Sequence, residues 1–431
     1  MTVPHGSVFA QRQQAPLPSV TRIAAFGESV IREMTRLAQR YDAVNLAQGF
    51  PDFPAPAPVK AAAVRAIRGD LNQYAVTWGA PELRAAIAAA YGRRGWAGID
   101  PEHDVTVVCG ATEAIAAACL ALLEEGSEVL VCDPLHESYA PALLLAGARA
   151  VPVPLRWPDW TFDADALRGA VGPHTRALIL TNPHNPTGRV FRDDELAAIA
   201  ALCRDHDLFA FTDEIYEHIV YEGRHRFLAQ YPGMAERTVT VSALSKAYAV
   251  TGWRVGWAIA PAPLSDALRK VHDFLTIAAP TPFQAAGVAA LGLGDAYHER
   301  LAHVYRRRRD LLLRALAPAG MAGAAPQGAY YVLADVSPHL AAGGFADSAE
   351  FAKWLVEEAG VAVVPGTALF LTPGAGRALV RLAFPKRRAT LELAGERLIA
   401  AARRLGVAPR RVFAQRQRAG RAQQGREGRR A

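Results

Sequence analysis

The chain has 431 residues, 51% hydrophobic and 21% charged, a composition typical of a soluble globular protein with room for two domains. Its formal net charge of +7 equals that of residues 409–431, which hold eight arginines and one glutamate, so the rest is neutral and no nucleic-acid-binding body is expected. No apolar run can span a bilayer, no signal peptide is present and the four cysteines form no CxxC pair, which predicts a cytoplasmic protein without a membrane or metal site.

Both ends of the chain lack the apolar periodicity of packed elements. Residues 1–20 are polar and rich in Pro and Gln, and residues 409–431 are rich in Arg, Gln and Gly, which is typical of disorder. We expect solvated extensions, with at most weak contacts between the tail and RNA or acidic partners. A helix is predicted over residues 28–41, and the Gly- and Pro-rich loop that follows, residues 44–54, is expected to line a site.

The central part of the chain alternates between helices and short apolar runs. Helices are predicted over residues 58–68 and 81–91, and six strand-like runs follow them. The predicted strands are residues 105–109, 128–132, 177–181, 208–212, 238–244 and 255–260. Near-continuous apolar strands between helices predict an α/β large domain, residues 58–295, with a mostly parallel sheet covered on both faces.

The pattern changes after residue 295. An Arg-rich helix is predicted first, and strands and helices then alternate without a repeat. The predicted elements are the helices 301–316, 348–359 and 390–405 and the strands 329–335 and 379–384. They predict a smaller α+β domain over residues 296–408, which residues 21–57 are expected to join as an N-terminal arm.

Polar residues follow the first three strands of the large domain, where an open α/β sheet binds its ligands. Gly110, Ala111 and Thr112 open a helix after the first strand, and free amides, a hydroxyl and the helix dipole can hold a phosphate there. Alone, these residues are more typical of an ordinary threonine N-cap. Residues 133–139 supply an aromatic ring after the second strand, and two Asn-Pro turns after the third leave the Asn185 amide facing a ligand.

The next strands end on an acid, a phenol and two cations. Asp213 and Tyr216 are three residues apart and can point the same way. Lys246 follows an apolar strand among apolar and aromatic neighbours, which favours a neutral amine that can attack an aldehyde, and Arg254 comes eight residues later. A lone lysine of this kind is usually an ordinary surface cation. The whole ordered set, however, is what a phosphorylated pyridine aldehyde needs.

Seven motifs extend this interpretation over about residues 25–405. They are Asn-Leu-Ala-Gln-Gly-Phe-Pro-Asp-Phe (45–53), Asn-Gln-Tyr (72–74), Gly-Ala-Thr-Glu-Ala (110–114), Asn-Pro-His-Asn-Pro-Thr-Gly (182–188), Thr-Asp-Glu-Ile-Tyr-Glu-His (212–218), Ser-Lys with Arg-Val-Gly after seven further residues (245–256) and Val-Arg-Leu-Ala-Phe (380–384). With them the chain resembles the fold-type I, class I/II aminotransferases that use pyridoxal 5'-phosphate (PLP). It is most similar to the branch with kynurenine, glutamine-phenylpyruvate and methionine aminotransferases.

The resemblance implies a seven-stranded-type sheet and a role for each matched residue. Lys246 would form the Schiff base and carry the proton shift, Asp213 would pair with the pyridine nitrogen, and Tyr216 and Asn185 would bond the ring oxygen. The residues expected at the cofactor phosphate are Gly110, Ala111, Thr112, Ser245, Arg254 and, from the other subunit of an obligatory homodimer, Tyr74. Arg381 would bind the substrate α-carboxylate, helped by Gly49 and Asn185.

Three positions depart from the family pattern. Ala243 stands where Gly or Ser is expected three residues before the lysine, so Ser242 or Ser245 would have to supply the phosphate hydroxyl. His136 takes the place of the Phe, Tyr or Trp that covers the cofactor ring, with Tyr139 as the alternative stacking residue. Residues 277–279 are Ile-Ala-Ala where kynurenine-type members have aromatic residues, which argues against kynurenine as the donor.

Three activities are compatible with these residues. The first is ping-pong transfer of the amino group of an L-amino acid, of apolar, aromatic, Met or Gln type, to a 2-oxo acid. The second is β-elimination by a carbon–sulfur lyase of the same fold. The third is a PLP-sensing regulator without turnover, but residues 1–25 are too short for the DNA-binding module that such regulators carry. The first activity is expected.

Overall fold

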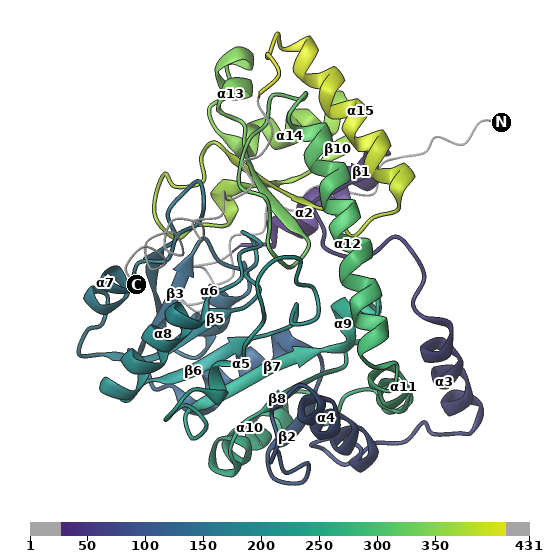
Figure 1. Cartoon of the computed structure of the whole chain (residues 1–431), viewed down its shortest axis with the longest axis vertical. Coiled ribbons are helices and arrows are strands. Elements are labelled where there is room, and N and C mark those ends of the chain that lie inside the picture. The colour runs from purple at the N-terminus through teal and green to yellow at the C-terminus, as the bar shows by residue number, and fades with distance from the viewer. Residues whose placement is uncertain (1–26, 411–431) are drawn as a thin grey trace, which may run out of the picture.

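The computed structural model describes residues 27–410, which contain one large sheet and two small ones (Figure 1). The large sheet has seven strands in the order β2-β8-β7-β6-β5-β3-β4. They are β2 (Val105–Val108), β3 (Glu128–Asp133), β4 (Arg149–Pro154), β5 (Thr175–Thr181), β6 (Phe209–Asp213), β7 (Thr238–Ala243) and β8 (Gly256–Ile259). Neighbours run parallel except where β8 pairs with β2 and β7. The predicted α/β class with a mostly parallel sheet is confirmed.

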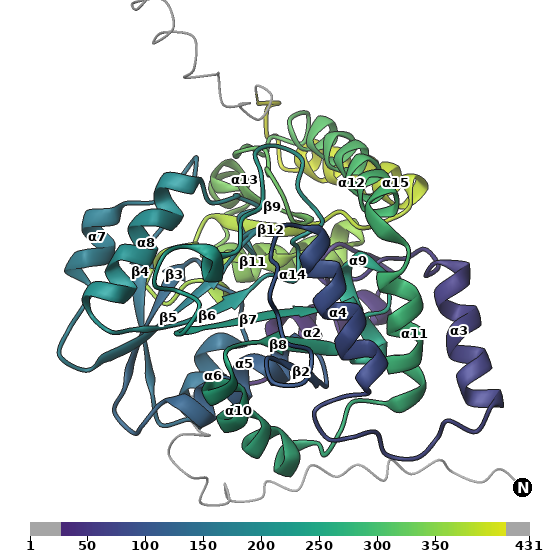
Figure 2. The ribbon, with the colours of Figure 1, turned by 60° about the horizontal axis from the view of Figure 1, so that its bottom comes forward.

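Helices cover both faces of this sheet (Figure 2). They are α3 (Ala57–Arg68), α4 (Pro81–Arg93), α5 (Ala111–Leu122), α6 (Tyr139–Leu145), α7 (Ala164–Gly169), α8 (Asp193–Asp205), α9 (Leu244–Ala247), α10 (Ala262–Leu275) and α11 (Thr281–Leu291). Alternate residues of β5 face opposite sides, as the period of a strand requires. Ala177 and Ile179 pack in the core with α5, α6 and α10, whereas Leu178 and Leu180 pack in the core with α8.

The edge strand β4 is absent from the six predicted strands. Its sequence, Arg-Ala-Val-Pro-Val-Pro, contains two prolines, and only Val153 is buried. Proline lacks an amide hydrogen and is tolerated on an edge strand, where one side needs no partner. Residues 149–154 therefore do not show the continuous apolar pattern by which the inner strands were predicted.

The antiparallel strand β8 begins at the edge of the sheet where its neighbours end. Its first residue, Gly256, pairs with Val108 at the end of β2 and with Ala243 at the end of β7. The turn before Gly256 carries Arg254, which therefore lies among the carboxyl ends of the parallel strands. Because β8 is antiparallel to its neighbours, Arg254 lies with the carboxyl ends of the parallel strands although it comes before β8 in the sequence.

The two small sheets are formed by distant parts of the chain. The first contains β11 (Val364–Pro365), β12 (Leu379–Ala383) and β9 (Tyr331–Asp335), all antiparallel, and in the second β1 (Val44–Asn45) pairs in parallel with β10 (Val361–Ala362). Their helices are α2 (Val30–Arg40), α12 (Gly294–Leu316), α13 (Ser337–Gly343), α14 (Ser348–Ala359) and α15 (Arg388–Arg404). The smaller α+β part is confirmed, while the domain limits at residues 58, 295 and 408 stay predictions.

The ends of the described chain are only partly those that were predicted. Residues 1–20 and most of the Arg-rich tail, both predicted to be disordered, lie outside the described residues. Arg410 is held in place, because its amide donates to the Ala317 carbonyl at 2.9 Å and its guanidinium to Asp335 Oδ2 at 2.5 Å. The packed chain therefore extends into the predicted tail.

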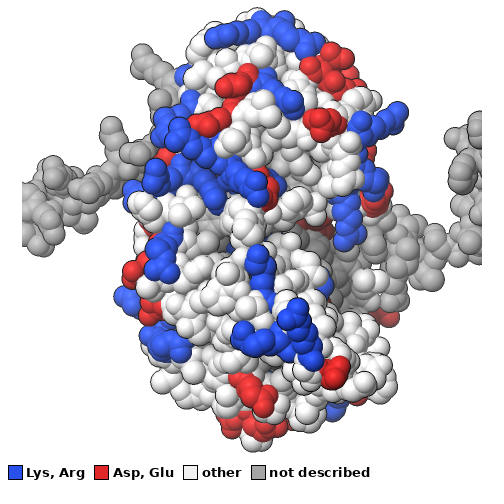
Figure 3. Space-filling view, turned by 90° about the vertical axis from the view of Figure 1, so that its right-hand side faces the viewer, with Lys and Arg blue, Asp and Glu red and all other residues white. Residues whose placement is uncertain are grey.

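The surface of the described part carries charges of both signs (Figure 3). Lys and Arg gather over one region of this face, and Asp and Glu lie close by. None of the helices between residues 27 and 410 is both long and apolar enough to cross a bilayer.

Candidate active site

A cavity lies at the edge of the large sheet where the parallel strands end. It is lined by Ala111, Thr112, Ile115, His136, Ser138, Tyr139, Asn185, Asp213, Ile215, Tyr216, Ser245, Lys246, Thr251 and Arg254. All of the predicted cofactor residues are among them except Gly110, which adjoins Ala111, and Tyr74. The order of the strands in the sheet therefore brings these separate residues, from Ala111 to Arg254, together around one cavity.

The start of α5 forms a corner rich in hydrogen-bond donors. Gly110 precedes the helix with φ of 88°, a conformation that favours glycine, and a Cβ there would lie 2.2 Å from Arg254 Nη2. Only glycine therefore lets the guanidinium approach the helix start, where Arg254 donates to the Cys109 and Thr251 carbonyls at 3.1 Å each. The first amides of a helix have no partner within it, so this corner suits a phosphate.

Asp213 ends β6 at the base of the cavity. Its Oδ2 accepts a hydrogen bond from the Tyr139 hydroxyl at 2.6 Å, and its Oδ1 accepts one from the Ile215 amide at 3.3 Å. Burial raises the pKa of Asp213, whereas these two donors and the charge of Lys246 act in the opposite direction. A half-buried carboxylate that faces the cavity in this way is well suited to hold a cation.

Lys246 lies in α9 directly after β7, with its amine in the cavity. Its Nζ donates to the Gly49 carbonyl at 3.3 Å and lies 6.0 Å from the centre of the Tyr216 ring. The Tyr216 hydroxyl donates to the Tyr331 hydroxyl at 3.0 Å, and burial raises the pKa of Tyr216 well above its usual range. The phenol is therefore neutral beside the amine.

Arg381 links the three-stranded sheet to the cavity, because it contacts Asn185, which lines it. It lies within β12, is 1% exposed, and donates to Asn185 Oδ1 at 3.1 Å and to the Ala47 carbonyl at 3.0 Å. The ring of Tyr331 lies 4.3 Å below its guanidinium carbon. Its buried Nε has no hydrogen-bond partner among residues 27–410. An arginine with a donor to spare is prepared to bind a carboxylate.

Gly49 contacts the cavity through Lys246. A Cβ at this position would lie 1.9 Å from the Tyr331 hydroxyl oxygen, so no larger residue fits here. The Gly49 carbonyl accepts hydrogen bonds from the Tyr330 hydroxyl at 2.8 Å and from Lys246. The predicted site loop, residues 44–54, is therefore bonded to Tyr330, just before β9, and to Lys246, just after β7.

His136 also lines the cavity, with its Nδ1 2.7 Å from Ser138 Oγ and its ring centre 5.5 Å from that of Tyr139. Burial, followed by the charges of Arg381 and Lys246, lowers the pKa of His136 to about 3. The protein environment itself therefore keeps His136 neutral near neutral pH.

Replacing His136 with phenylalanine should leave cofactor binding at least as tight, because phenylalanine offers more ring area for stacking. Since a histidine with a pKa of about 3 is neutral in both free and loaded protein, the pH profile of the cofactor Kd should not change near neutral pH. Fluorescence titration of both proteins at several pH values measures this. A histidine-linked step near neutral pH in the wild type alone would contradict it.

Of the two serines considered as substitutes for the missing hydroxyl at Ala243, only Ser245 lines the cavity. The Ser242 hydroxyl donates to Glu217 Oε1 at 2.6 Å and is buried away from it. Ser242 therefore does not replace the missing hydroxyl, because successive residues of a strand, such as Ser242 and Ala243 in β7, face opposite sides of the sheet. Tyr74 is 79% exposed and lies outside this cavity in the single chain.

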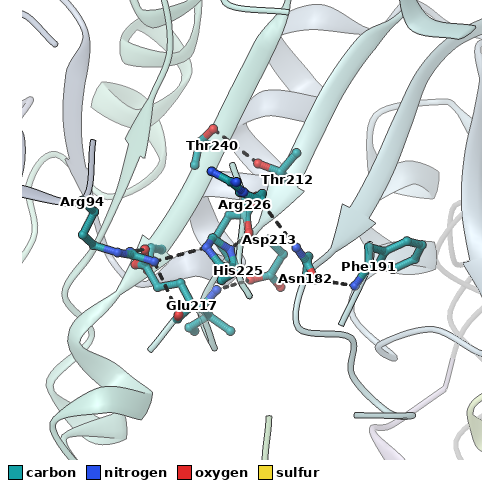
Figure 4. A network of polar contacts seen from close by, with 12 residues as sticks. Arg94, Asn182, Phe191, Thr212, Asp213, Glu217, His225, Arg226 and Thr240 are labelled. Atoms are coloured by element: carbon teal, nitrogen blue, oxygen red, sulfur yellow. Dashed lines mark hydrogen bonds and ion pairs between the residues drawn. The ribbon is translucent and has the colours of Figure 1, made fainter. Parts of the chain in front are cut away.

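Glu217 belongs to a buried polar network beside Asp213 (Figure 4). It accepts hydrogen bonds from Arg94, Ser242 and, at 3.0 Å, from the Tyr91 hydroxyl. His225 links Arg94, at 3.2 Å, to the neighbouring Glu214 at 2.5 Å. Glu214 and Glu217, the two glutamates of the Asp-Glu-Ile-Tyr-Glu motif, thus belong to this polar network and do not line the cavity.

Sequence reasoning missed the partners of Asp213. Tyr139 was considered only as a stacking residue, and Thr181, whose Oγ1 lies 2.7 Å from the Tyr139 hydroxyl, was not considered. Thr181 ends β5, as Asp213 ends β6, and Tyr139 lies in the segment that follows β3, so their position at this edge of the sheet was the available signal. Their hydrogen bonds depend on the order β6-β5-β3 in the sheet.

Comparison with known proteins identifies the family. The family model for aminotransferase class I and II matches residues 41–394. The chain belongs to the class I and II aminotransferases. It is 45% identical over 399 residues to a probable N-succinyldiaminopimelate aminotransferase of Mycobacterium tuberculosis, covering 90% of this chain and 99% of that protein. It is 37% identical over 384 residues to the methionine aminotransferase of Escherichia coli, covering 89% and 98%.

The fold agrees with this assignment. A solved structure of N-succinyldiaminopimelate aminotransferase from Mycobacterium tuberculosis has a TM-score of 0.86 at 44% identity, covering 89% of this chain and 100% of that one. This aminotransferase is therefore a PLP-dependent, fold-type I transaminase, and the predicted branch with methionine aminotransferase is confirmed.

The described residues fit PLP chemically. A phosphate needs cationic and amide donors, which Arg254 and the start of α5 provide around the cradle at Gly110. A pyridinium nitrogen needs an anion such as Asp213, and an aldehyde needs an amine such as Lys246. All of these groups face one cavity.

Proposed function

We propose that Lys246 binds the aldehyde carbon of PLP and that Asp213 pairs with its ring nitrogen. Asn185 and Tyr216 bond the ring oxygen. The phosphate is held by Gly110, Ala111, Thr112, Ser245 and Arg254. This proposal is carried by the convergence of an amine, a carboxylate and an arginine-lined helix start in one cavity.

The chemistry follows from where these groups lie. Bound PLP supplies an electron sink for charge that develops at the substrate α-carbon. Once the substrate amine has replaced it at the aldehyde carbon, Lys246 Nζ would be free to take the proton from the α-carbon, and the Asp213 carboxylate would hold a proton on the ring nitrogen. Arg381 and Asn185, which touch one another at 3.1 Å, orient the substrate α-carboxylate with help from the Gly49 backbone.

The substrates are an L-amino acid and a 2-oxo acid. The sequence predicts a donor of apolar, aromatic, Met or Gln type, which is also the type named in the methionine aminotransferase relative. The relative with 45% identity favours a second donor, N-succinyldiaminopimelate. Both donors present the α-amino and α-carboxyl groups that Lys246 and Arg381 require.

A substrate panel tests the function. Methionine, phenylalanine, glutamine, kynurenine and N-succinyldiaminopimelate are each offered with 2-oxoglutarate or pyruvate, and cofactor spectra follow each half-reaction. We expect amino transfer that depends on the oxo acid. Release of pyruvate and ammonia from cysteine conjugates, without any dependence on an oxo acid, would instead indicate the β-eliminating lyase.

We also propose a homodimer to which Tyr74 contributes across the interface. Exposed apolar side chains gather on two segments that touch through Thr77 and Asp273 at 3.2 Å. They are Leu71, Tyr74, Val76, Phe274, Leu275 and Ile277, and Phe274 is 91% exposed. A second copy that covers this patch would remove it from water, which stabilises association. The four free cysteines are compatible with the proposed cytoplasmic location.

Replacing Phe274 with aspartate should weaken the dimer and lower activity, because it buries a charge in the proposed interface. Sedimentation velocity over a dilution series measures the dimer. Leu393→Asp, at a residue 41% exposed on α15, is the matched control and should remain dimeric. A Phe274→Asp protein that stays dimeric at every concentration would contradict this interface.

A further inference from the structure

Two buried side chains, Tyr139 and Thr181, and the half-buried Asp213 form a chain of hydroxyl and carboxylate groups at the cavity. The Tyr139 hydroxyl donates to Asp213 Oδ2 at 2.6 Å and lies 2.7 Å from Thr181 Oγ1. Tyr139, Thr181 and Asp213 come from the start of α6, the end of β5 and the end of β6, and Thr181 and Asp213 pair in register. Three rigid elements therefore fix the geometry of the group.

The direction of the hydrogen bonds follows from the number of protons. A phenol has a single proton, and the Tyr139 hydroxyl gives it to Asp213. Thr181 must then donate its own hydroxyl proton to the Tyr139 oxygen. Burial, followed by the nearby charge of Asp213, raises the pKa of Tyr139 well above its usual range, so the phenol stays a donor. The chain thus ends with a proton directed at the carboxylate.

We propose that Tyr139, supported by Thr181, is a positioning residue that keeps the Asp213 carboxylate ionised and oriented toward the cofactor ring nitrogen. This inference rests on the role of Asp213 given under Proposed function. Tyr139 and the Ile215 amide each take one lone pair of a different Asp213 oxygen, so the carboxylate cannot rotate freely. A lone pair on each oxygen remains for a ligand in the cavity.

The effect on the reaction is electrostatic. Burial alone favours the neutral form of Asp213, which could not hold a proton on a ring nitrogen. A charge-assisted hydrogen bond from a neutral phenol favours the ionised form. The ring nitrogen then stays protonated, and the bound cofactor withdraws electrons more strongly. Tyr139 thus acts through Asp213 and does not touch the reacting atoms.

Tyr139→Phe tests the proposal, because it keeps the aromatic ring and removes only the hydroxyl. We expect the Kd for PLP to rise roughly tenfold or more, and kcat to fall with little change in KM. The pH midpoint of the visible absorbance change of the lysine-bound cofactor should move upward, since a less positive ring leaves its nitrogen link to Lys246 more basic. Thr181→Val should show smaller changes in the same direction, and Thr181→Ser should restore the wild-type values.

Tyr221→Phe is the matched control. Tyr221 is half-buried, and its hydroxyl donates to the Ala329 carbonyl at 2.5 Å, outside the cavity. Its replacement should change thermal stability without moving the PLP Kd or the absorbance midpoint. If Tyr139→Phe matches this control in Kd and midpoint, Tyr139 is a packing or stacking residue only and the inference fails.

Asp213→Asn separates this inference from the proposed function. If Asp213→Asn binds PLP and turns over like the wild type, the role of Asp213 itself is wrong. If Asp213→Asn is impaired but Tyr139→Phe is not, only the positioning role is wrong. When Tyr139→Phe is added to Asp213→Asn to make the double variant, the Kd for PLP should not change further, because there is no longer a carboxylate for the Tyr139 hydroxyl to hold. An additive effect in that variant would overturn the inference.

Discussion

Replacing Lys246 with alanine should abolish transamination and the visible absorbance of the lysine-bound cofactor. Lys246 is the only lysine that lines the described cavity, and its amine lies beside Gly49 and the Tyr216 ring. Without it, no group at this position can both hold the aldehyde and take the α-proton. We expect kcat to fall by at least ~10³-fold, while thermal stability changes little.

A buried lysine outside the cavity provides a control. Lys386 is 2% exposed, burial lowers its pKa to about 8, and it donates to the Phe50 carbonyl at 2.9 Å, outside the cavity. Borohydride reduction followed by peptide mapping identifies the lysine that carries the cofactor. Label on Lys246 in both the wild type and Lys386→Met would support the assignment. A Lys246→Ala protein that still transaminates would refute it.

The fold and most of the candidate site could be predicted because both depend on local pattern. Buried parallel strands appear as continuous apolar runs, and their carboxyl ends meet at one edge of a sheet. Asp213 and Lys246 follow such runs directly, so their convergence in the cavity was foreseeable. Strand β4 was not, because Pro152 and Pro154 interrupt its pattern at the edge of the sheet.

What the sequence could not provide is pairing between distant side chains. Ser242 and Ser245 are both close to Lys246 in sequence, yet only the packed sheet directs Ser242 to Glu217 and leaves Ser245 at the cavity. The hydrogen bond from Tyr139 to Asp213 likewise depends on which strands are neighbours. The low pKa of His136 comes mainly from burial, which a sequence does not state.

Replacing Arg381 with alanine should have the second large effect, on recognition of the substrate α-carboxylate. Arg381 is buried, touches Asn185 at 3.1 Å, and has a buried Nε without a partner in the described chain. Losing a charge-assisted, bidentate contact should raise the activation free energy measured by kcat/KM by ~3 kcal/mol. This lowers kcat/KM roughly a hundredfold. KM should rise, because the carboxylate is bound before the reaction as well as during it.

Two comparisons distinguish carboxylate recognition from damage to the fold. Arg309 is another buried arginine, and it does not line the cavity. Its guanidinium donates to Glu222 Oε1 at 2.9 Å, so Arg309→Ala should lower thermal stability but leave KM unchanged. Arg381→Lys keeps the charge and loses the fork, and should fall between wild type and alanine. The wild type should also prefer an amino acid to the corresponding amine without a carboxylate, and Arg381→Ala should lose this preference. If the preference survives in Arg381→Ala, the α-carboxylate is bound by another group.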